Sequence, residues 1–133
     1  MAGELPTVLC IDDDPDVLAV TRACMESDGE WNVITANSGR EALETAADAQ
    51  VSAILLDVMM PEMDGMETLK ALRRIPALNN VPIIFMTARV WHSEIRGYLA
   101  QGANGVLSKP FDPMSLSAQV LEIWRNFDAK QER

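Results

Sequence analysis

The chain has 133 residues, of which 48% are hydrophobic and 23% are charged, so its length and composition are typical of one soluble globular domain with a buried core. Its formal net charge of -9 disfavours direct binding to nucleic acid, because an acidic surface repels the phosphate backbone, and favours a basic partner or a cation site. No apolar run is long enough to cross a membrane and the N-terminus lacks a secretory signal pattern, so we expect a cytoplasmic protein that does not bind membranes. Cys10 and Cys24 form no metal-ligand or redox pattern and are expected to be small buried thiols.

Five short β-rich runs alternate along the chain with five longer segments of helical periodicity. The expected strands cover residues 7–11, 31–35, 53–56, 81–86 and 105–108. The expected helices cover about residues 17–25, 38–48, 65–73, 93–100 and 116–127, with a loop at 76–80. On the first helix one apolar face is expected to carry Val17, Val20, Thr21 and Cys24, flanked by Leu18 and Met25.

The first, third and fourth strands are nearly continuous apolar runs, which is typical of a parallel sheet covered by helices on both faces. Strict alternation of strands and helices indicates the same architecture, because parallel neighbours need helical crossovers. We therefore predict an α/β fold with a five-stranded parallel sheet, in a single domain over residues 1–133 that ends in a short charged tail.

Polar residues follow four of the five expected strands. Asp12 and Asp13 follow the first strand, Asp57 the third, Thr87 the fourth, and Ser108 and Lys109 the fifth. Ligands of open parallel sheets bind at the carboxyl ends of the strands, and these side chains converge there if the second strand lies at an edge.

Converging carboxylates need a positive partner. Two like charges 4 Å apart repel by about 4 kcal/mol at an effective dielectric of 20. A site with several carboxylates suits Mg²⁺, which usually completes its shell with water and a phosphate oxygen. Asp57, alone at the end of the central strand, is then the natural nucleophile, because aspartyl phosphates are an established covalent form.

Five motifs together resemble the receiver domain of two-component response regulators. They are IDDDP (11–15), LLDVMMPEMDG (55–65), TA (87–88), GA (102–103) and KPF (109–111), and the similarity covers about residues 6–127. The resemblance implies a flavodoxin-like fold with strand order 2-1-3-4-5, as in stand-alone chemotaxis regulators. It also implies a phosphoprotein that is not a classical enzyme, although it catalyses its own phosphorylation and slow dephosphorylation.

The resemblance further implies a role for each matching residue. Asp57 would accept a phosphoryl group from a histidine kinase or a histidine phosphotransfer protein. Asp12, Asp13, Asp57 and the backbone carbonyl of Met59 would hold Mg²⁺. Lys109, before a cis Lys-Pro bond, would pair with the phosphoryl group.

The signal is expected to leave the site through Thr87, which would move to bind a phosphoryl oxygen. The downstream protein would then bind the face of the fourth helix, fifth strand and fifth helix. Val106 stands where the family often has an aromatic residue that swings with the threonine, so the fourth helix or Trp91 in the loop before it could carry the signal instead. The resemblance also implies that Met59 and Arg89 flank the phosphate, and we expect an apolar residue at position 59 to favour a longer-lived phosphoryl group.

Several alternatives remain open from the residues alone. Asp14, Pro15 and Asp16 are typical of a helix start, whereas one helix cap cannot also use Asp12 and Asp13. The chain could instead be a fragment of a longer regulator with an output domain, or a pseudo-receiver that never carries phosphate.

A Mg²⁺-dependent phosphohydrolase working through an aspartyl phosphate is a further alternative. Such an enzyme typically has a second acid two residues after its nucleophile, where this chain has Met59.

Overall fold

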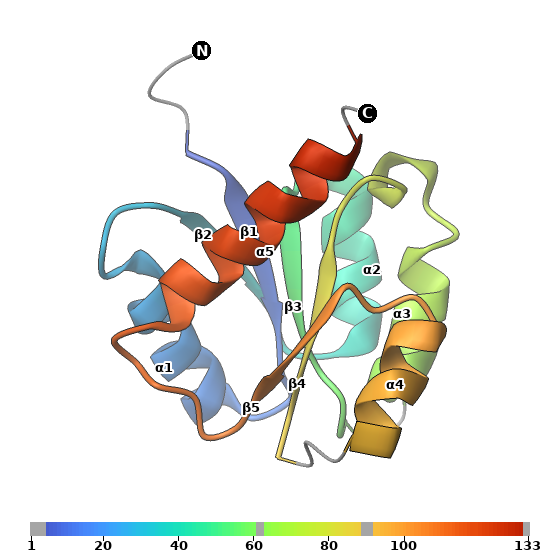
Figure 1. Ribbon diagram of the computed structural model, residues 1–133, viewed down its shortest axis with the longest axis horizontal. Helices are drawn as coiled ribbons and strands as arrows, with labels where there is room; N and C mark the ends of the chain where they lie inside the picture. The colour runs from blue at the N-terminus through green and yellow to red at the C-terminus, as the bar shows by residue number, and fades with distance from the viewer. Residues whose placement is uncertain (1–4, 61–62, 89–91, 132–133) are drawn as a thin grey trace.

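The computed structural model describes residues 5–60, 63–88 and 92–131, which form alternating strands and helices (Figure 1). In chain order the elements are β1 (Thr7–Ile11), α1 (Pro15–Glu26), β2 (Asn32–Ala36), α2 (Gly39–Asp48), β3 (Ala53–Asp57), α3 (Gly65–Leu72), the 3-10 turn η1 (Pro76–Leu78), β4 (Ile83–Thr87), α4 (His92–Ala100), β5 (Gly105–Ser108) and α5 (Leu116–Gln131). Within the described ranges, no helix combines the length and apolar character needed to cross a bilayer.

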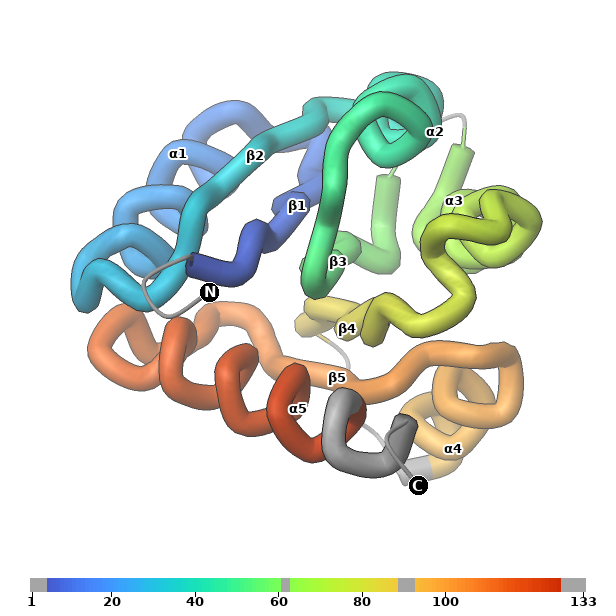
Figure 2. The backbone as a smooth tube through the Cα atoms, turned by 90° about the horizontal axis from the view of Figure 1, so that it is seen from above, coloured from blue at the N-terminus to red at the C-terminus, as the bar shows by residue number. Residues whose placement is uncertain are grey.

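The five strands form one parallel sheet in the order β2-β1-β3-β4-β5, which confirms the predicted topology. Helices α1 and α5 cover one face of this sheet, and α2, α3 and α4 cover the other (Figure 2). Every residue of β3 and β4 is buried, as expected for central strands that pack on both faces. β2 and β5 are the edges, so the carboxyl ends of β1, β3, β4 and β5 are neighbours.

The expected apolar face of α1 is only partly correct. The residues that α1 buries are Leu18, Thr21, Cys24 and Met25. Val20 is 51% exposed and Val17 is half-buried, so these two valines point away from the core. The helix is amphipathic as predicted, but not all of its apolar residues are buried in the core.

β4 begins two residues later than its apolar run suggested and ends at Thr87. Pro82 has no backbone N–H to donate to a ladder, although its carbonyl accepts a 3.0 Å hydrogen bond from the Ile54 N–H. The shift makes Thr87 the last paired residue of the strand, opposite Ser108 of β5. The loop expected at residues 76–80 contains η1.

The half-buried guanidinium of Arg73 joins the end of α3 to the η1 turn with the residues just after it and to the loop between α4 and β5. It donates hydrogen bonds to the carbonyls of Leu78 and Val81 at 2.9 Å and of Gly102 at 3.3 Å, and to Asn104 Oδ1 at 2.6 Å. Burial lowers the pKa of Arg73 from its ordinary value, because the charge is partly removed from water. The end of α3, the η1 turn and the loop between α4 and β5 therefore depend on one side chain.

Candidate functional site

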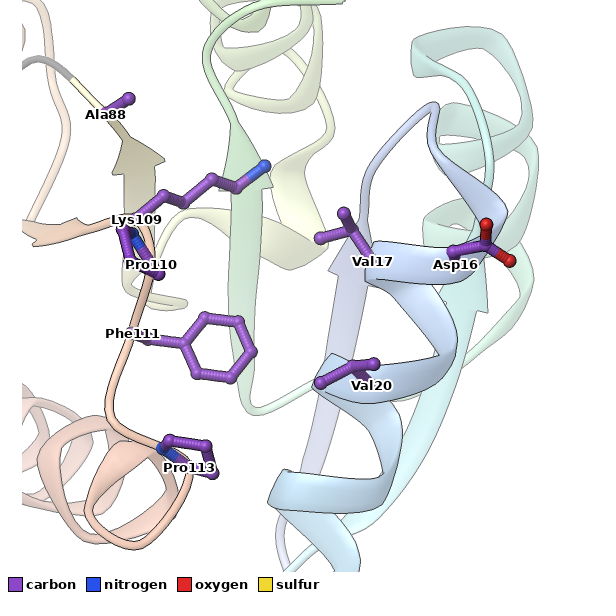
Figure 3. A pocket seen from close by; sticks show the side chains of 8 residues that line it. All are labelled: Asp16, Val17, Val20, Ala88, Lys109, Pro110, Phe111 and Pro113. Carbon is purple, nitrogen blue, oxygen red and sulfur yellow. The ribbon is translucent and has the colours of Figure 1, made fainter.

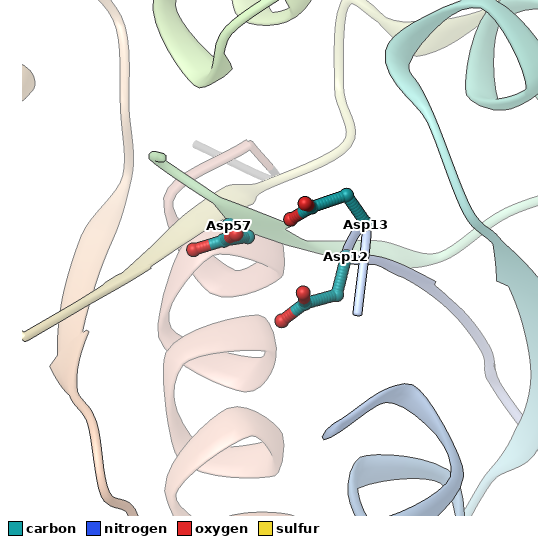
Figure 4. A group of neighbouring side chains, drawn as sticks. All are labelled: Asp12, Asp13 and Asp57. Carbon is teal, nitrogen blue, oxygen red and sulfur yellow. The ribbon is translucent and has the colours of Figure 1, made fainter. Parts of the chain in front are cut away.

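The three aspartates predicted to converge lie together at the carboxyl edge of the sheet. Asp12 and Asp13 follow β1, and Asp57 is the last residue of β3. One ligand oxygen from each lies within 4.8 Å of the other two, and the three carboxylates turn toward a common point (Figure 4). Asp12 and Asp57 are buried, whereas Asp13 is exposed.

Both carboxylate oxygens of Asp12 are held by hydrogen bonds. Asp12 Oδ1 accepts the backbone N–H of Asp14 at 3.0 Å, and Asp12 Oδ2 accepts the amine of Lys109 at 2.7 Å. The backbone of Asp12 is also fixed, because its N–H donates to the carbonyl of Ala36 on β2 at 3.2 Å. Asp12 is therefore oriented before any ligand arrives.

The next acids of the cluster serve the helix instead. Asp14 is the N-cap of α1, and its side chain accepts the N–H groups of Asp16 and Val17 at 2.9 and 3.4 Å. Pro15 occupies the first position of the helix, where no N–H is needed. The predicted division between a cation-binding pair and a helix start fits this geometry.

Lys109 reaches the site from β5 and bridges two of the carboxylates. Its Nζ lies 2.7 Å from Asp12 and 3.1 Å from Asp57. Burial lowers the pKa of Lys109, but its hydrogen bonds and charge interactions with the two carboxylates outweigh this and raise the pKa above its ordinary value. The amine therefore stays charged at neutral pH. The Lys109–Pro110 peptide bond is cis, as the resemblance implied.

Asp57 experiences opposing influences. Burial raises its pKa and the charge of Asp12 raises it further, whereas Lys109 and a hydrogen bond from the backbone of Met59 lower it, and the net shift is upward. Ionised Asp57 is therefore less stable than an ordinary carboxylate, chiefly because burial removes it from water and secondly because Asp12 repels it.

A divalent cation fits this donor set. Mg²⁺ prefers oxygen ligands at about 2.0–2.1 Å, so the ligand oxygens of an octahedral shell lie about 3 to 4 Å apart. The oxygens of Asp12, Asp13 and Asp57 lie within 4.8 Å of one another, which is close to that spacing. The site can hold such an ion, and net negative charge provides the reason to do so.

Thr87 and Met59 complete the described surroundings of Asp57. Thr87 ends β4 and is 2% exposed. The Met59 side chain is 65% exposed, although its backbone bonds to the Asp57 carboxylate. Arg89 and Trp91, which the sequence also singled out, lie outside the described residues.

Sequence reasoning missed the structural role of Gly65. A Cβ atom there would lie 2.7 Å from Val58 Cα and 2.9 Å from the carbonyl oxygen of Asp57, so only glycine allows α3 to begin so close to the end of β3. The Gly65 N–H donates to the Val58 carbonyl at 3.0 Å. The Asp64-Gly65 pair suggests a turn, and no local signal reveals that the glycine is needed for close approach.

Sequence reasoning also missed an apolar groove of about 510 Å³ that leads away from the site. One wall is the exposed side of α1, with Val17 and Val20, and the other is the segment after β5, with Phe111 (Figure 3). Lys109 lines the same groove, so it opens directly beside the carboxylate cluster. The sequence did hold one indication of this groove: α1 carries Val17 and Val20 in addition to the residues that it buries in the core.

Comparison with known proteins agrees with this geometry. The family model for the response regulator receiver domain matches residues 8–121. The chain is 35% identical over 127 residues to the response regulator Rre1 of Synechocystis sp., covering 95% of this chain and 53% of that protein. It is 37% identical over 118 residues to the transcriptional regulatory protein CpxR of Escherichia coli, covering 89% of this chain and 49% of that protein.

Among solved structures, the chemotaxis protein CheY4 of Vibrio cholerae is similar, with a TM-score of 0.85 and 32% identity, covering 90% of this chain and 99% of that one. The chain spans about half the length of the curated relatives Rre1 and CpxR. The family match, the strand order and the carboxylate cluster lead to one conclusion: this chain belongs to the receiver domains of two-component response regulators.

Proposed function

We propose that the domain accepts a phosphoryl group on Asp57 from a phosphohistidine of a histidine kinase or a phosphotransfer protein. The observation that carries this proposal is the position of the Asp57 carboxylate, 3.1 Å from a charged amine and within a cluster of two further carboxylates. A receiver that only bound partners would not need to bury this unfavourable charge.

The reaction is a phosphoryl transfer. A carboxylate oxygen of Asp57 forms the new bond to phosphorus while the bond from phosphorus to the donor imidazole nitrogen breaks. The imidazole leaves with the bonding electron pair and takes a proton from solvent. Lys109 is placed to pair with a phosphoryl oxygen, because its amine already contacts the accepting carboxylate.

Asp12, Asp13 and Asp57, with the backbone carbonyl of Met59, are the residues that would hold Mg²⁺. When bound, the ion neutralises the carboxylates and the transferring phosphoryl oxygens. The buried, hydrogen-bonded state of Asp12 supports this assignment, since a fixed carboxylate loses little freedom on ligation.

The groove beside Lys109 is suited to the phosphodonor protein. Its walls are apolar valine and phenylalanine side chains, its rim carries Asp16, and it opens at the acceptor site. We propose that an apolar surface of the donor packs there and brings its phosphohistidine to Asp57. Val20→Asp should therefore slow transfer from the protein donor but not from acetyl phosphate, whereas Ala47→Asp on exposed α2 surface should slow neither.

The downstream signal is proposed to pass to a protein bound at the α4–β5–α5 face. Val106 is half-buried against the same core cluster as Tyr98 of α4, and Tyr98 packs edge-to-face on Phe85 of β4 with ring centroids 5.2 Å apart. The Phe85–Tyr98 contact gives a path from β4 to α4 that does not need an aromatic residue at position 106. Cys10 and Cys24 are free thiols, which supports the expected cytoplasmic location.

The proposal is tested by incubating the domain with Mg²⁺ and acetyl phosphate. We expect one phosphoryl group per chain, none in the presence of a chelator, and none on Asp57→Asn. Equal labelling of Asp57→Asn would refute the assignment. Multiple turnover of free phosphate esters would indicate a phosphohydrolase instead, a function that Met59 in place of a second acid does not support.

A further inference from the structure

The start of α2 packs unusually closely on the start of α3 at Gly39. A Cβ atom at Gly39 would lie 2.5 Å from Thr68 Oγ1 and 2.8 Å from Met63 Sδ, both shorter than real carbon contacts. Gly39 is buried, and its α2 lies beside α3 on the same face of the sheet (Figure 2). Any larger residue at position 39 must therefore displace both of these neighbours.

The Thr68 neighbour cannot move freely. Its side chain is fully buried, and its Oγ1 donates a 2.8 Å hydrogen bond to the carbonyl of Asp64. Asp64 is the N-cap of α3 and forms a reciprocal capping box with Glu67. A push on Thr68 is therefore transmitted to the first turn of α3.

The first turn of α3 is in turn fixed to the phosphoacceptor strand. Gly65 donates to the carbonyl of Val58 at 3.0 Å, and its Cα packs so closely that a Cβ would meet the carbonyl oxygen of Asp57 at 2.9 Å. Between Val58 and Gly65 lies the β3–α3 loop, of which the structure describes residues 58–60 and 63–64. This loop carries Met59, whose backbone bonds to the Asp57 carboxylate.

We propose that Gly39 is a positioning residue for the cation site. It allows α2 to pack against Met63 and Thr68 and so holds the first turn of α3, where Gly65 contacts Val58 and thereby positions the adjoining Met59 backbone beside Asp57. The inference rests on the proposed Mg²⁺ site and adds a residue that belongs to none of its ligands. A larger side chain at position 39 shifts the loop and weakens cation binding without touching a carboxylate.

The test compares Gly39→Ala with Gly97→Ala in the full chain. Gly97 lies in α4, and a Cβ there meets no atom within 4 Å, so it controls for the exchange of glycine for alanine. Mg²⁺ affinity is measured by titration calorimetry, and folding by thermal unfolding in chelator. We expect Gly39→Ala to weaken Mg²⁺ binding about tenfold, in the range for residues that orient metal ligands, and Gly97→Ala to leave it unchanged.

A purely structural role would lower the unfolding temperature of Gly39→Ala but leave the Mg²⁺ affinity of the folded protein unaltered, and that result would overturn the proposal. The rate of phosphorylation by acetyl phosphate should recover for Gly39→Ala when Mg²⁺ is raised to saturation. If Gly39→Ala does not fold, Met63→Ala removes the same contact from the loop side. It should weaken Mg²⁺ binding severalfold, and wild-type affinity in Met63→Ala would then overturn the proposal.

The outcome is separable from the fate of the proposed function. If the unaltered chain binds no Mg²⁺, the proposed function itself fails, and this inference fails with it. If the unaltered chain binds Mg²⁺, and Gly39→Ala binds it as tightly as the unaltered chain and Gly97→Ala do, only the role of Gly39 is refuted.

Discussion

Replacing Asp57 by asparagine should stabilise the metal-free domain, because it removes a charge from a crowded site. The ligand oxygens of Asp12, Asp13 and Asp57 lie within 4.8 Å of one another. Repulsion from buried Asp12 amounts to about 3.5 kcal/mol at that distance and an effective dielectric of 20, and Asp13, which is exposed, adds less because water screens it. Burial adds a further cost, and Lys109, 3.1 Å away and worth about 5 kcal/mol at the same dielectric, does not offset the whole, since the net pKa shift of Asp57 is upward. We take the balance as about 2 kcal/mol against the ionised carboxylate.

The assay is thermal unfolding of the wild-type chain and Asp57→Asn at pH 7 in chelator. A gain of about 2 kcal/mol should raise the unfolding temperature of a domain of this size by about 6 to 10 °C. Glu44→Gln, which removes one charge from the exposed surface of α2, should change stability by less than about 0.5 kcal/mol. Saturating Mg²⁺ should remove the difference in unfolding temperature between wild type and Asp57→Asn, because the wild-type protein gains more stability from binding the ion.

The pH dependence provides a second readout of the same charge. The pKa of Asp57 is raised in the folded state above its ordinary value of 3.8, so the native carboxyl binds its proton more tightly than the unfolded one. Wild type therefore loses stability relative to Asp57→Asn as pH rises from 3.8 through the raised pKa. The difference in stability between the two proteins becomes smaller as pH falls through the same range. An Asp57→Asn variant no more stable than wild type in chelator at pH 7 would refute the electrostatic reasoning.

Three further substitutions test other parts of the structure. Gly65→Ala should lower the free energy of unfolding by about 2 kcal/mol in chemical denaturation, since its Cβ meets backbone atoms that cannot move aside; an unchanged midpoint would contradict the close approach. Arg73→Met should cost about 3 kcal/mol in the same assay because it strands several buried acceptors, whereas Arg74→Met, on an exposed neighbour, should cost little. Met59→Asn should shorten the lifetime of the phosphorylated domain after donor removal, because an amide can orient the attacking water; the same lifetime in both proteins would exclude that role.

The convergence of the site could be predicted because it depends on strand ends. Asp12, Asp57 and Lys109 each lie at the end of an apolar run, and parallel strands place all such ends at one edge of the sheet. The residues alone predict that these three side chains converge only if the second strand lies at an edge of the sheet. The resemblance to receiver domains supplied the strand order that meets this condition.

Features that depend on how closely two elements approach could not be predicted in this way. Gly65 and Gly39 both lie where an added Cβ atom would come within 3 Å of a segment that is distant in sequence or separated by a loop. The partners of Arg73 include Asn104, 31 residues away, and no periodicity in the chain links them. The position of Val20 could not be predicted either, because the helical pattern does not distinguish an apolar residue that faces a surface groove from one that faces the core.

The most direct test of the central claim is to locate the phosphoryl group on the chain. The domain would be phosphorylated with acetyl phosphate and Mg²⁺, reduced with borohydride to convert the acyl phosphate to a stable alcohol, and mapped by peptide mass spectrometry. The account predicts a single modified position, Asp57, in the peptide that contains the end of β3. Modification at His92 or at another carboxylate, with Asp57 intact, would contradict it.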